Sequence, residues 1–292
     1  MSTRVVVTGG SAGLGYFTAE RLARTGTRVT IAARSVERAD RAVASIRAFV
    51  PRARVDRDRL DLADLASVRD AAAELVADGP IDGVVLNAGV LPWDRPSPTA
   101  DGLEPVFGVN QLGHFALLAQ LFPALSDDAG VVSLGSVTHR GKRLDLDQPQ
   151  RRRRDAYGHS KLAVMTTAIE LDRRARAAGR RVRSVIAHPG RASGALDPAR
   201  PGITVRSAVP GFSLAIRGFA HSKEAGAAIS VHALRHGLGG HCYGPDGRLL
   251  GLRGGPVAQE LRGPVLDPQA GARLWALSEE LTGVRFEVSG RA

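Results

Sequence analysis

The chain has 292 residues, enough for one large domain or two small ones, and its hydrophobic content of 43% is typical of a globular protein with a sizeable core. Its formal net charge is +11, carried almost entirely by arginine, and its one cysteine, Cys242, excludes an internal disulfide. The arginines are spread along the chain and aromatic residues make up only 4%, so we favour a general surface property over a nucleic-acid-binding face.

These observations predict where the protein works. A single cysteine suits a reducing compartment, which favours a cytoplasmic location. The first apolar run, Val5-Val6-Val7, is too short for the core of a signal peptide, and no later run approaches a membrane span. We therefore expect a small-molecule substrate as the main partner, with no nucleic-acid partner and no membrane span.

The first elements are a strand, a glycine-rich turn, a helix and a second strand. Residues 4–8 and 28–33 are short, apolar and β-branched, which predicts two buried strands. Between them lies GGSAGLG, residues 9–15, followed by a helical pattern that ends near Gly26. Glycines let the backbone approach a pyrophosphate closely, and a helix N-terminus offers free N–H groups. The unit therefore predicts a nucleotide phosphate site.

The end of the second strand distinguishes between cofactors. An acidic residue there would bind the adenosine 2′-hydroxyl, but in this chain Ala33 is followed by Arg34. A guanidinium favours a 2′-phosphate, so the sequence predicts NADP(H) in preference to NAD(H). The alternative is that Arg34 is one more solvated arginine in an arginine-rich chain.

The following elements alternate in type. Further strands are predicted over 54–60 (atypically charged), 81–86, 131–134 and 182–187, and helices over 38–49, 63–76, 103–125 and 157–178. Six strands alternating with helices predict an α/β fold, a doubly wound parallel sheet of Rossmann type, in a single domain over 1–292 with helices on both faces. Functional residues of such sheets collect at the C-terminal ends of the strands, where we find Ser11, Asn87, Ser136, Pro189 and Gly190.

The chain after Gly190 departs from the alternation. Helices are predicted over 208–220, 224–235 and 269–281, and residues 239–256 are rich in turn formers. Three segments, 91–102, 143–155 and 191–220, are predicted to form the substrate pocket. They mix arginines with the apolar residues Leu91, Trp93, Leu196, Phe212, Leu214 and Phe219. The run Arg151 to Arg154 either steers an acidic substrate or, as we favour, forms a solvated loop.

The pair Tyr157 and Lys161 carries the chemistry that we expect. Four residues apart on a helix, both side chains lie on one face. A phenol has a pKa near ~10, and a nearby ammonium favours the phenolate and lowers that pKa. Such a pair can give or take a proton on a substrate oxygen. The alternative is an ordinary surface pair.

Two further sets of polar residues have competing interpretations. A buried Asn110 needs partners, and it either bonds backbone groups or holds a water or the ammonium of Lys161. His232 and His236 are one helical turn apart, with His241 and Cys242 nearby, but no H-E-x-x-H pattern is present. A zinc site needs three or four ligands, so we predict no metal.

With these positions in place, the chain resembles a classical short-chain dehydrogenase/reductase, in the retinol-dehydrogenase-like branch. The resemblance covers nearly the whole chain and rests on these motifs in order: TGGSAGLG at 8–15, Asp61-Leu62, Asn87-Ala88-Gly89, Asn110, Ser136, Tyr157-x-x-x-Lys161 and Pro189-Gly190. The stretches DLADLASVR, DGLEPVFGVNQLGHFAL and LWALSEELTG are similar to that branch as well.

The resemblance implies an oxidoreductase that transfers a hydride between NADP(H) and a carbonyl or alcohol of a bulky, lipophilic or polycyclic substrate. Tyr157 would be the general acid/base, Ser136 would bond the substrate oxygen, and Lys161 would lower the Tyr157 pKa and bind the nicotinamide ribose. Asn110 would support a proton relay to Lys161. The implied cofactor-binding set is Gly9, Ser11, Gly13, Leu14, Gly15, Arg34, Asp61, Leu62, Asn87, Ala88, Gly89, Tyr157, Lys161, Pro189 and Gly190.

One departure from the family pattern bears on the cofactor. The family commonly has a Thr four residues past the glycine of Pro189-Gly190, where it bonds the carboxamide or diphosphate. Here that position is Gly194, with Ser193 beside it as a substitute. The alternative function is therefore a non-redox enzyme, such as a dehydratase or cyclase, or a cofactor-binding module on the same fold.

Relatives often pair through the helices that carry Asn110 and Tyr157, which favours a homodimer.

Overall fold

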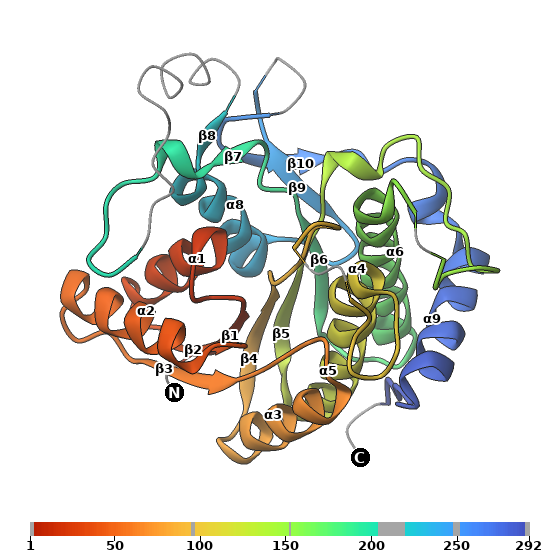
Figure 1. Cartoon of the computed structure of the whole chain (residues 1–292), viewed down its shortest axis with the longest axis horizontal. Coiled ribbons are helices and arrows are strands. Elements are labelled where there is room, and N and C mark those ends of the chain that lie inside the picture. The colour runs from red at the N-terminus through yellow and green to blue at the C-terminus, as the bar shows by residue number, and fades with distance from the viewer. Residues whose placement is uncertain (1–2, 95–96, 152, 204–219, 248–251, 290–292) are drawn as a thin grey trace.

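The computed structural model describes residues 3–94, 97–151, 153–203, 220–247 and 252–289. An eight-stranded sheet runs through the centre of the molecule (Figure 1), in the order β10-β9-β6-β5-β4-β1-β2-β3. Its strands are β1 Arg4–Thr8, β2 Arg28–Ala33, β3 Val55–Arg59, β4 Ile81–Leu86, β5 Leu125–Leu134, β6 Arg183–Ala187, β9 Cys242–Pro245 and β10 Pro256–Gln259. All pair in parallel except β10, which is antiparallel to β9. The doubly wound parallel sheet that the sequence predicts is confirmed.

Alternating side chains of the central strands fill two cores. Val5 and Val7 of β1 pack with helices α1 (Gly13–Ala23), α2 (Val36–Phe49) and α8 (Lys223–His236). Val6, between them, faces the opposite core with α3 (Leu65–Ala77), α5 (His114–Leu121) and α6 (Ala156–Ala177). Helices therefore cover both faces, as predicted. The chain order reverses at β1, which lies between β2 and β4, and ligands of such sheets bind at this switch point.

Two strands of the sheet were not predicted. β9 and β10 arise from the segment 239–256, which the sequence marks as turn-rich, and its neighbours. Gly244 and Pro245 are poor strand formers, so local preference hides β9. The strand forms because Ile186 and Ala187 of β6 offer it a parallel partner. The sheet consequently has eight strands rather than six.

The helix predicted over 103–125 is interrupted. It consists of α4 (Pro105–Phe107), a π-helical segment Gly108–Gly113, α5, and a 3₁₀ turn Phe122–Ala124 that leads directly into β5. A Cβ on Gly113 would lie 2.3 Å from the carbonyl oxygen of Leu62, so this close approach requires glycine. π-helical turns are frequent at functional sites, and this one carries Asn110.

The charged strand β3 lies at one edge of the sheet. Its sequence VDRDR has only Val55 buried, and an edge position explains why a strand can be so polar. Arg57 pairs with Asp40 at 2.8 Å, and Arg28 of β2 pairs with Asp56 at 3.3 Å. The atypical composition therefore reflects exposure rather than an irregular segment.

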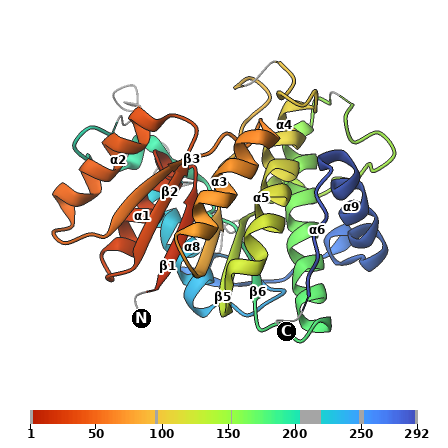
Figure 2. The same ribbon diagram turned by 90° about the horizontal axis from the view of Figure 1, so that it is seen from below.

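The C-terminal helix α9 (Pro268–Thr282) covers the helices through which we expected a homodimer to form. Figure 2 shows α3, α5 and α6 side by side with α9 next to α6. Trp275 of α9 is buried against Phe115 of α5 at 5.1 Å between ring centroids, and Phe286 packs on Phe115 and Phe122. Pairing through these helices is thus not supported by the arrangement of the chain.

The remaining described segments flank the sheet. A small parallel pair joins β7 (Ala192–Ser193) to β8 (His221–Ser222), and 3₁₀ turns lie at Val137–His139, Gly194–Leu196 and Gly263–Leu266. The helix predicted over 208–220 falls, except for Ala220, outside the described residues, as do Phe212, Leu214, Phe219 and Arg152. Across the described part of the chain, none of the helices is both long enough and apolar enough to cross a bilayer.

Candidate active site

The turn after β1 is shaped by its glycines. Gly9 and Gly13 have φ angles of 67° and 59°, in the left-handed region that favours glycine. A Cβ on Gly15 would lie 2.4 Å from Nδ2 of Asn87 and 2.5 Å from the carbonyl oxygen of Gly9. The first turn of α1 can therefore pack directly onto the ends of β1 and β4. Its free N–H groups face the crevice in which a phosphate would bind.

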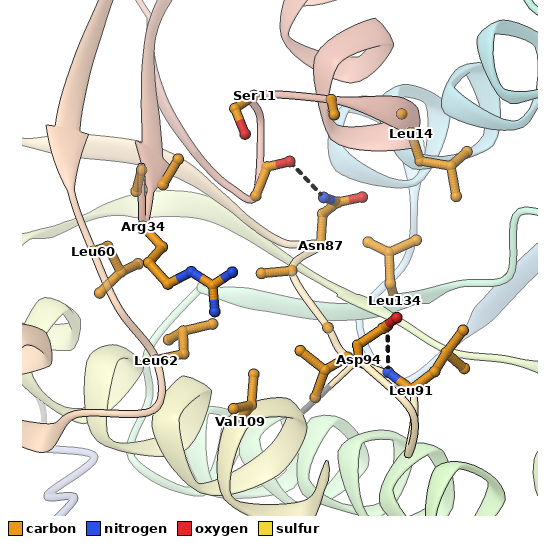
Figure 3. A pocket seen from close by; sticks show the side chains of 18 of the residues that line it. Ser11, Leu14, Arg34, Leu60, Leu62, Asn87, Leu91, Asp94, Val109 and Leu134 are labelled. Carbon is orange, nitrogen blue, oxygen red and sulfur yellow. Dashed lines mark hydrogen bonds between the residues drawn. The ribbon is translucent and has the colours of Figure 1, made fainter. Parts of the chain in front are cut away.

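A cavity of about 590 Å³ lies above this turn at the switch point of the sheet, and Figure 3 shows it from close by. All the predicted cofactor residues except Gly15 and Gly190 line it. Gly15 lies beneath the turn, and Gly190 faces the carbonyl oxygen of Leu252. Further lining residues are Ala12, Ala32, Ala33, Ser35, Arg38, Leu60, Val90, Leu91, Asp94, Val109, Leu134, Gly135 and Lys223.

The end of β2 presents a cationic group to this cavity. Arg34 is exposed and extends into the cavity, and Arg38 of α2 also lines it. Neither Arg34 nor Arg38 forms an ion pair with a carboxylate of the described residues. Asp61, on the neighbouring loop, accepts the Ala63 N–H at 3.0 Å. Arg38 was missed from the sequence, because it lies in the first turn of α2 and Arg34 precedes that helix, so no helical spacing connects the two.

Thr8 joins the Asn87-Ala88-Gly89 turn to the helix that carries Asn110. Its buried Oγ1 accepts the N–H groups of Asn87 and Ala88, both at 3.0 Å. Nε2 of His114 lies 2.9 Å from the same oxygen, and Nδ1 lies 3.0 Å from the carbonyl oxygen of Asn110. Because that carbonyl only accepts, Nδ1 carries the proton and the Thr8 hydroxyl donates to Nε2. Burial lowers the pKa of His114 to about 4, which keeps the ring neutral.

Asn110 lies behind Gly89 and not at the surface of the cavity. Its Oδ1 accepts the Val90 N–H at 2.8 Å, and Nδ2 donates to the carbonyl oxygen of Val90 and to Ser160 Oγ, at 3.1 and 3.0 Å. Of the two alternatives for Asn110, the structure shows the one in which its side chain bonds backbone groups. A role toward water or Lys161 stays a prediction.

Tyr157 and Lys161 both project from α6 into the cavity. Lys161 is buried, its Nζ donates to the carbonyl oxygen of Leu134 at 2.7 Å, and it lies 5.7 Å from the centroid of the Tyr157 ring. Burial lowers the pKa of Lys161 to about 8. Among the protein groups, burial also raises the pKa of Tyr157, and a hydrogen bond with Ser136 lowers it by less. A lowering of the Tyr157 pKa by Lys161 stays a prediction, and here the ammonium of Lys161 is directed at Leu134.

A second cavity of about 590 Å³ begins at Ser136. Met165, Cys242 and Leu261 supply apolar surface. Cationic side chains also line it: Arg140, Lys142 and Arg262. Sequence reasoning missed the contribution of residues 259–264, whose segment has no periodic pattern.

His188 is the buried polar group of this second cavity. Its side chain is 8% exposed, and neither ring nitrogen has a hydrogen-bond partner within the described chain. Burial, reinforced by the charge of Arg140, lowers its pKa to about 4. A neutral imidazole therefore lies in the wall next to Ser136.

The predicted pocket segments contribute unevenly to the two cavities. From 91–102, Leu91 and Asp94 line the first cavity, while no described residue of 143–155 or 191–203 lines either one. Arg153 instead pairs with Asp145 at 2.7 Å and with Asp155 at 3.2 Å, which fits the loop interpretation of the arginine run. Ser193, considered as a substitute for the family Thr, accepts the N–H of Ala195 at 3.4 Å.

The histidines that suggested a metal lie apart from both cavities. The rings of His232 and His236 are 5.3 Å apart on α8, and Nδ1 of His241 bonds the carbonyl oxygen of Gly239. Within the described residues, no three His, Cys, Asp or Glu side chains are grouped in a way that would hold a metal ion.

Comparison with known proteins identifies the family to which this chain is similar. The family model described as short chain dehydrogenase matches residues 3–200. Mouse retinol dehydrogenase 12 is 39% identical over 64% of this chain and 60% of its own length, and mouse polyprenol dehydrogenase is 41% identical over 63% and 58%. The matched part thus spans less than two thirds of either relative. Human retinol dehydrogenase 12 is 33% identical, over 97% of this chain and 87% of the human protein.

Solved structures agree with the sequence comparison. The crystal structure of an uncharacterised protein from Mycobacterium paratuberculosis superposes with a TM-score of 0.79, 32% identity and coverage of 98% of this chain and 95% of that one. A short chain dehydrogenase from Escherichia coli, solved with NADPH, has a TM-score of 0.52 and 26% identity, over 64% and 76% of the chains. This chain belongs to the short-chain dehydrogenase/reductase family, in its retinol-dehydrogenase-like branch.

Proposed function

We propose that the protein is an NADP(H)-dependent oxidoreductase that interconverts an alcohol and a carbonyl on a bulky, lipophilic substrate. The observation that carries this proposal is the position of Tyr157 and Ser136. Tyr157 opens onto a cavity with a glycine-lined phosphate site, while Ser136, whose hydroxyl lowers the pKa of Tyr157, opens onto a second cavity. One cavity suits a dinucleotide and the other a substrate, and the reacting atoms would meet between them.

The first cavity fits the cofactor on its own residues. The turn from Gly9 to Gly15 leaves room for a diphosphate, and Arg34 and Arg38 provide charge for a 2′-phosphate. The NADPH complex of the Escherichia coli relative supports the same cofactor. When bound, NADPH supplies the hydride; the protein positions the substrate and manages the proton.

The described side chains account for the proton. Ser136 would hold the substrate oxygen, and Tyr157, whose pKa is raised by burial, would donate its phenol proton to that oxygen during reduction. Lys161 has a pKa of about 8, so it can change charge near neutral pH and return a proton toward Tyr157. Oxidation requires the phenolate, which needs more positive charge than the protein groups alone provide.

The second cavity indicates the class of substrate. Met165 and Leu261 offer apolar contacts to a hydrocarbon body, and the cations at Arg140 and Lys142 suit an additional polar or acidic group. The names of the relatives, retinol and polyprenol dehydrogenases, support a long lipophilic alcohol or its carbonyl counterpart. A cytoplasmic location and a homodimer formed through another surface are also proposed; light scattering coupled to size-exclusion chromatography tests the second.

The experiment is a calorimetric titration with NADPH and with NADH, followed by a panel of lipophilic aldehydes and ketones with absorbance at the NADPH band as the readout. We expect tighter binding of NADPH and loss of absorbance during turnover. Tyr157→Phe is expected to abolish turnover and leave NADPH binding nearly unchanged. Substrate conversion with constant absorbance would instead support a non-redox enzyme, and binding with no conversion would support a cofactor-binding module.

A further inference from the structure

Lys223 is a cation in the dinucleotide cavity that neither the motifs nor the comparisons assign. It is the first residue of α8 and lines the cavity together with Gly13 and Leu14. Its side chain lies across the glycine-rich turn, because a Cβ on Gly13 would be 3.4 Å from Cδ of Lys223 and 3.6 Å from its Nζ. The ammonium is therefore close to the start of α1, where a phosphate would bind.

The packing of α8 on α1 fixes this position. Gly226 lets the two helices touch, since a Cβ there would lie 2.9 Å from Cδ2 of Leu14. Arg21 of α1 donates to the carbonyl oxygen of Glu224 at 3.1 Å, and Ser222 caps α8 by accepting the Ala225 N–H. Lys223 is thus held beside the turn by a rigid element rather than by a loop.

Gly194 makes room for the ammonium. A Cβ on Gly194 would come within 3.0 Å of Nζ of Lys223, so any larger residue at this position would compete with the lysine for space. Position 194 is where the family commonly has a Thr that contacts the carboxamide or diphosphate. Here the lysine occupies the space that the Thr would need.

The ammonium is only weakly engaged within the protein. Its carboxylate neighbour is Asp197, whose Oδ2 lies 3.9 Å from Nζ, while Oδ1 accepts the backbone N–H of Lys223 at 2.6 Å. Burial raises the pKa of Asp197, and the N–H and the ammonium of Lys223 oppose that rise. With 34% of its side chain exposed, Lys223 is free to turn toward an anion in the cavity.

We propose that Lys223 binds the diphosphate of the dinucleotide and takes over the contact that the family assigns to the Thr at position 194. The proposal rests on the proposed cofactor site. A lysine contributes a full positive charge to the diphosphate, whereas a Thr contributes a neutral hydrogen bond, and charge-assisted hydrogen bonds are the stronger kind. Lys223 then replaces the Thr as the side chain that binds the diphosphate, so the missing Thr does not weaken the site.

The test measures dissociation constants by calorimetry for Lys223→Met with three probes: NADPH, ADP-ribose and 2′-AMP. ADP-ribose has the diphosphate but no nicotinamide, and 2′-AMP has the adenine and 2′-phosphate but no diphosphate. We expect NADPH and ADP-ribose to bind about tenfold more weakly, the order expected for one charge-assisted hydrogen bond, and 2′-AMP to bind as before. Arg69→Met, which removes the same charge from the exposed face of α3 outside both cavities, is the matched control and should leave all three constants unchanged.

A second pair of variants tests the exchange of anchors. Gly194→Thr alone should weaken NADPH binding because the new side chain meets Nζ of Lys223, whereas Gly194→Thr in the Lys223→Met protein should recover part of the lost affinity. Unchanged affinity for NADPH and ADP-ribose in Lys223→Met, or an equal loss for 2′-AMP, would overturn the proposal for Lys223. Failure of the unaltered protein to bind NADPH or NADH would instead overturn the proposed function.

Discussion

Replacing Thr8 by Val tests whether its hydroxyl joins the cofactor turn to the core. The change keeps the shape of the side chain and removes Oγ1, which accepts the N–H groups of Asn87 and Ala88 and donates to His114. The Asn87 N–H keeps the carbonyl oxygen of Val85 at 3.0 Å, so the half-buried Ala88 N–H and the buried Nε2 of His114 lose their partner. An unsatisfied buried group costs about 1–3 kcal/mol, so the expected destabilisation is about 3 kcal/mol.

Thr30→Val is the matched control, because it makes the same chemical change on the neighbouring strand β2. Thr30 is 2% exposed, and its hydroxyl has no hydrogen-bond partner among the described residues. Removing an unsatisfied hydroxyl should leave stability unchanged or raise it by up to about 1 kcal/mol. The two substitutions are therefore expected to act with opposite sign.

Urea denaturation and thermal melting without ligand measure both variants. For Thr8→Val we expect a fall in melting temperature of roughly 6 °C, at about 2 °C per kcal/mol for a chain of this size. NADPH affinity should fall with it, since Asn87 and Ala88 line the cavity. Equal midpoints for the two variants would refute the reasoning, because the partners of Thr8 would then contribute nothing that Thr30 lacks.

Three further predictions follow from the described contacts. Burial lowers the pKa of His114 from 6.5 to about 4, so between these pH values the unfolded chain binds a proton that the folded chain does not, and stability is lost as pH falls through this window. The loss of unfolding free energy by pH 5 should be about 2 kcal/mol. Urea denaturation at each pH should show a smaller loss in His114→Gln. Arg34→Ala should reduce the preference for NADPH over NADH by about tenfold, with NADH binding unchanged in calorimetry, and an equal loss for both cofactors would remove Arg34 from the 2′-phosphate site. Glu20 is fully buried and pairs with the buried Arg200 at 2.6 Å, so Glu20→Ala should lower the free energy of unfolding by about 3 kcal/mol. Asp128→Ala breaks an exposed pair with Arg181 and should leave the midpoint of urea denaturation unchanged.

The parts of the fold that the sequence predicts are those whose local pattern and burial agree. Residues 4–8 and 81–86 contain continuous apolar runs, 5–7 and 84–86, because both faces of a central parallel strand are buried, and the bounds of both strands are recovered without change. β9 is different, since Gly244 and Pro245 carry no strand signal and form part of a strand only through their antiparallel pairing with Val257 and Pro256 of β10. The π-helical segment at 108–113 is equally hidden, because its cause is the contact of Gly113 with Leu62, far away in sequence.

The residues of the candidate site also differ in whether a local sequence pattern identifies them. Motif residues at the ends of elements, such as Asn87 after β4 and Tyr157 in the first turn of α6, are identified from the sequence because the neighbouring strand or helix is recognisable. Lys223 and the wall formed by residues 259–264 reach the cavities only through the packing of later elements, so no local spacing marks them. The pKa of Tyr157 depends on burial and on the Ser136 hydroxyl, and the Lys161 ammonium points at Leu134, none of which a four-residue spacing reveals.

The alternating charges of β3 have a consequence for the protein at high concentration. An edge strand offers unpaired backbone groups that a second copy can use to extend the sheet, which is a common first step toward fibrils. If two copies of β3 met antiparallel about Arg57, that residue would face its own copy and Asp56 would face Asp58, so like charges would oppose one another along the contact. Exchanging these residues for apolar ones would leave the sheet intact within one molecule and remove its protection against joining another.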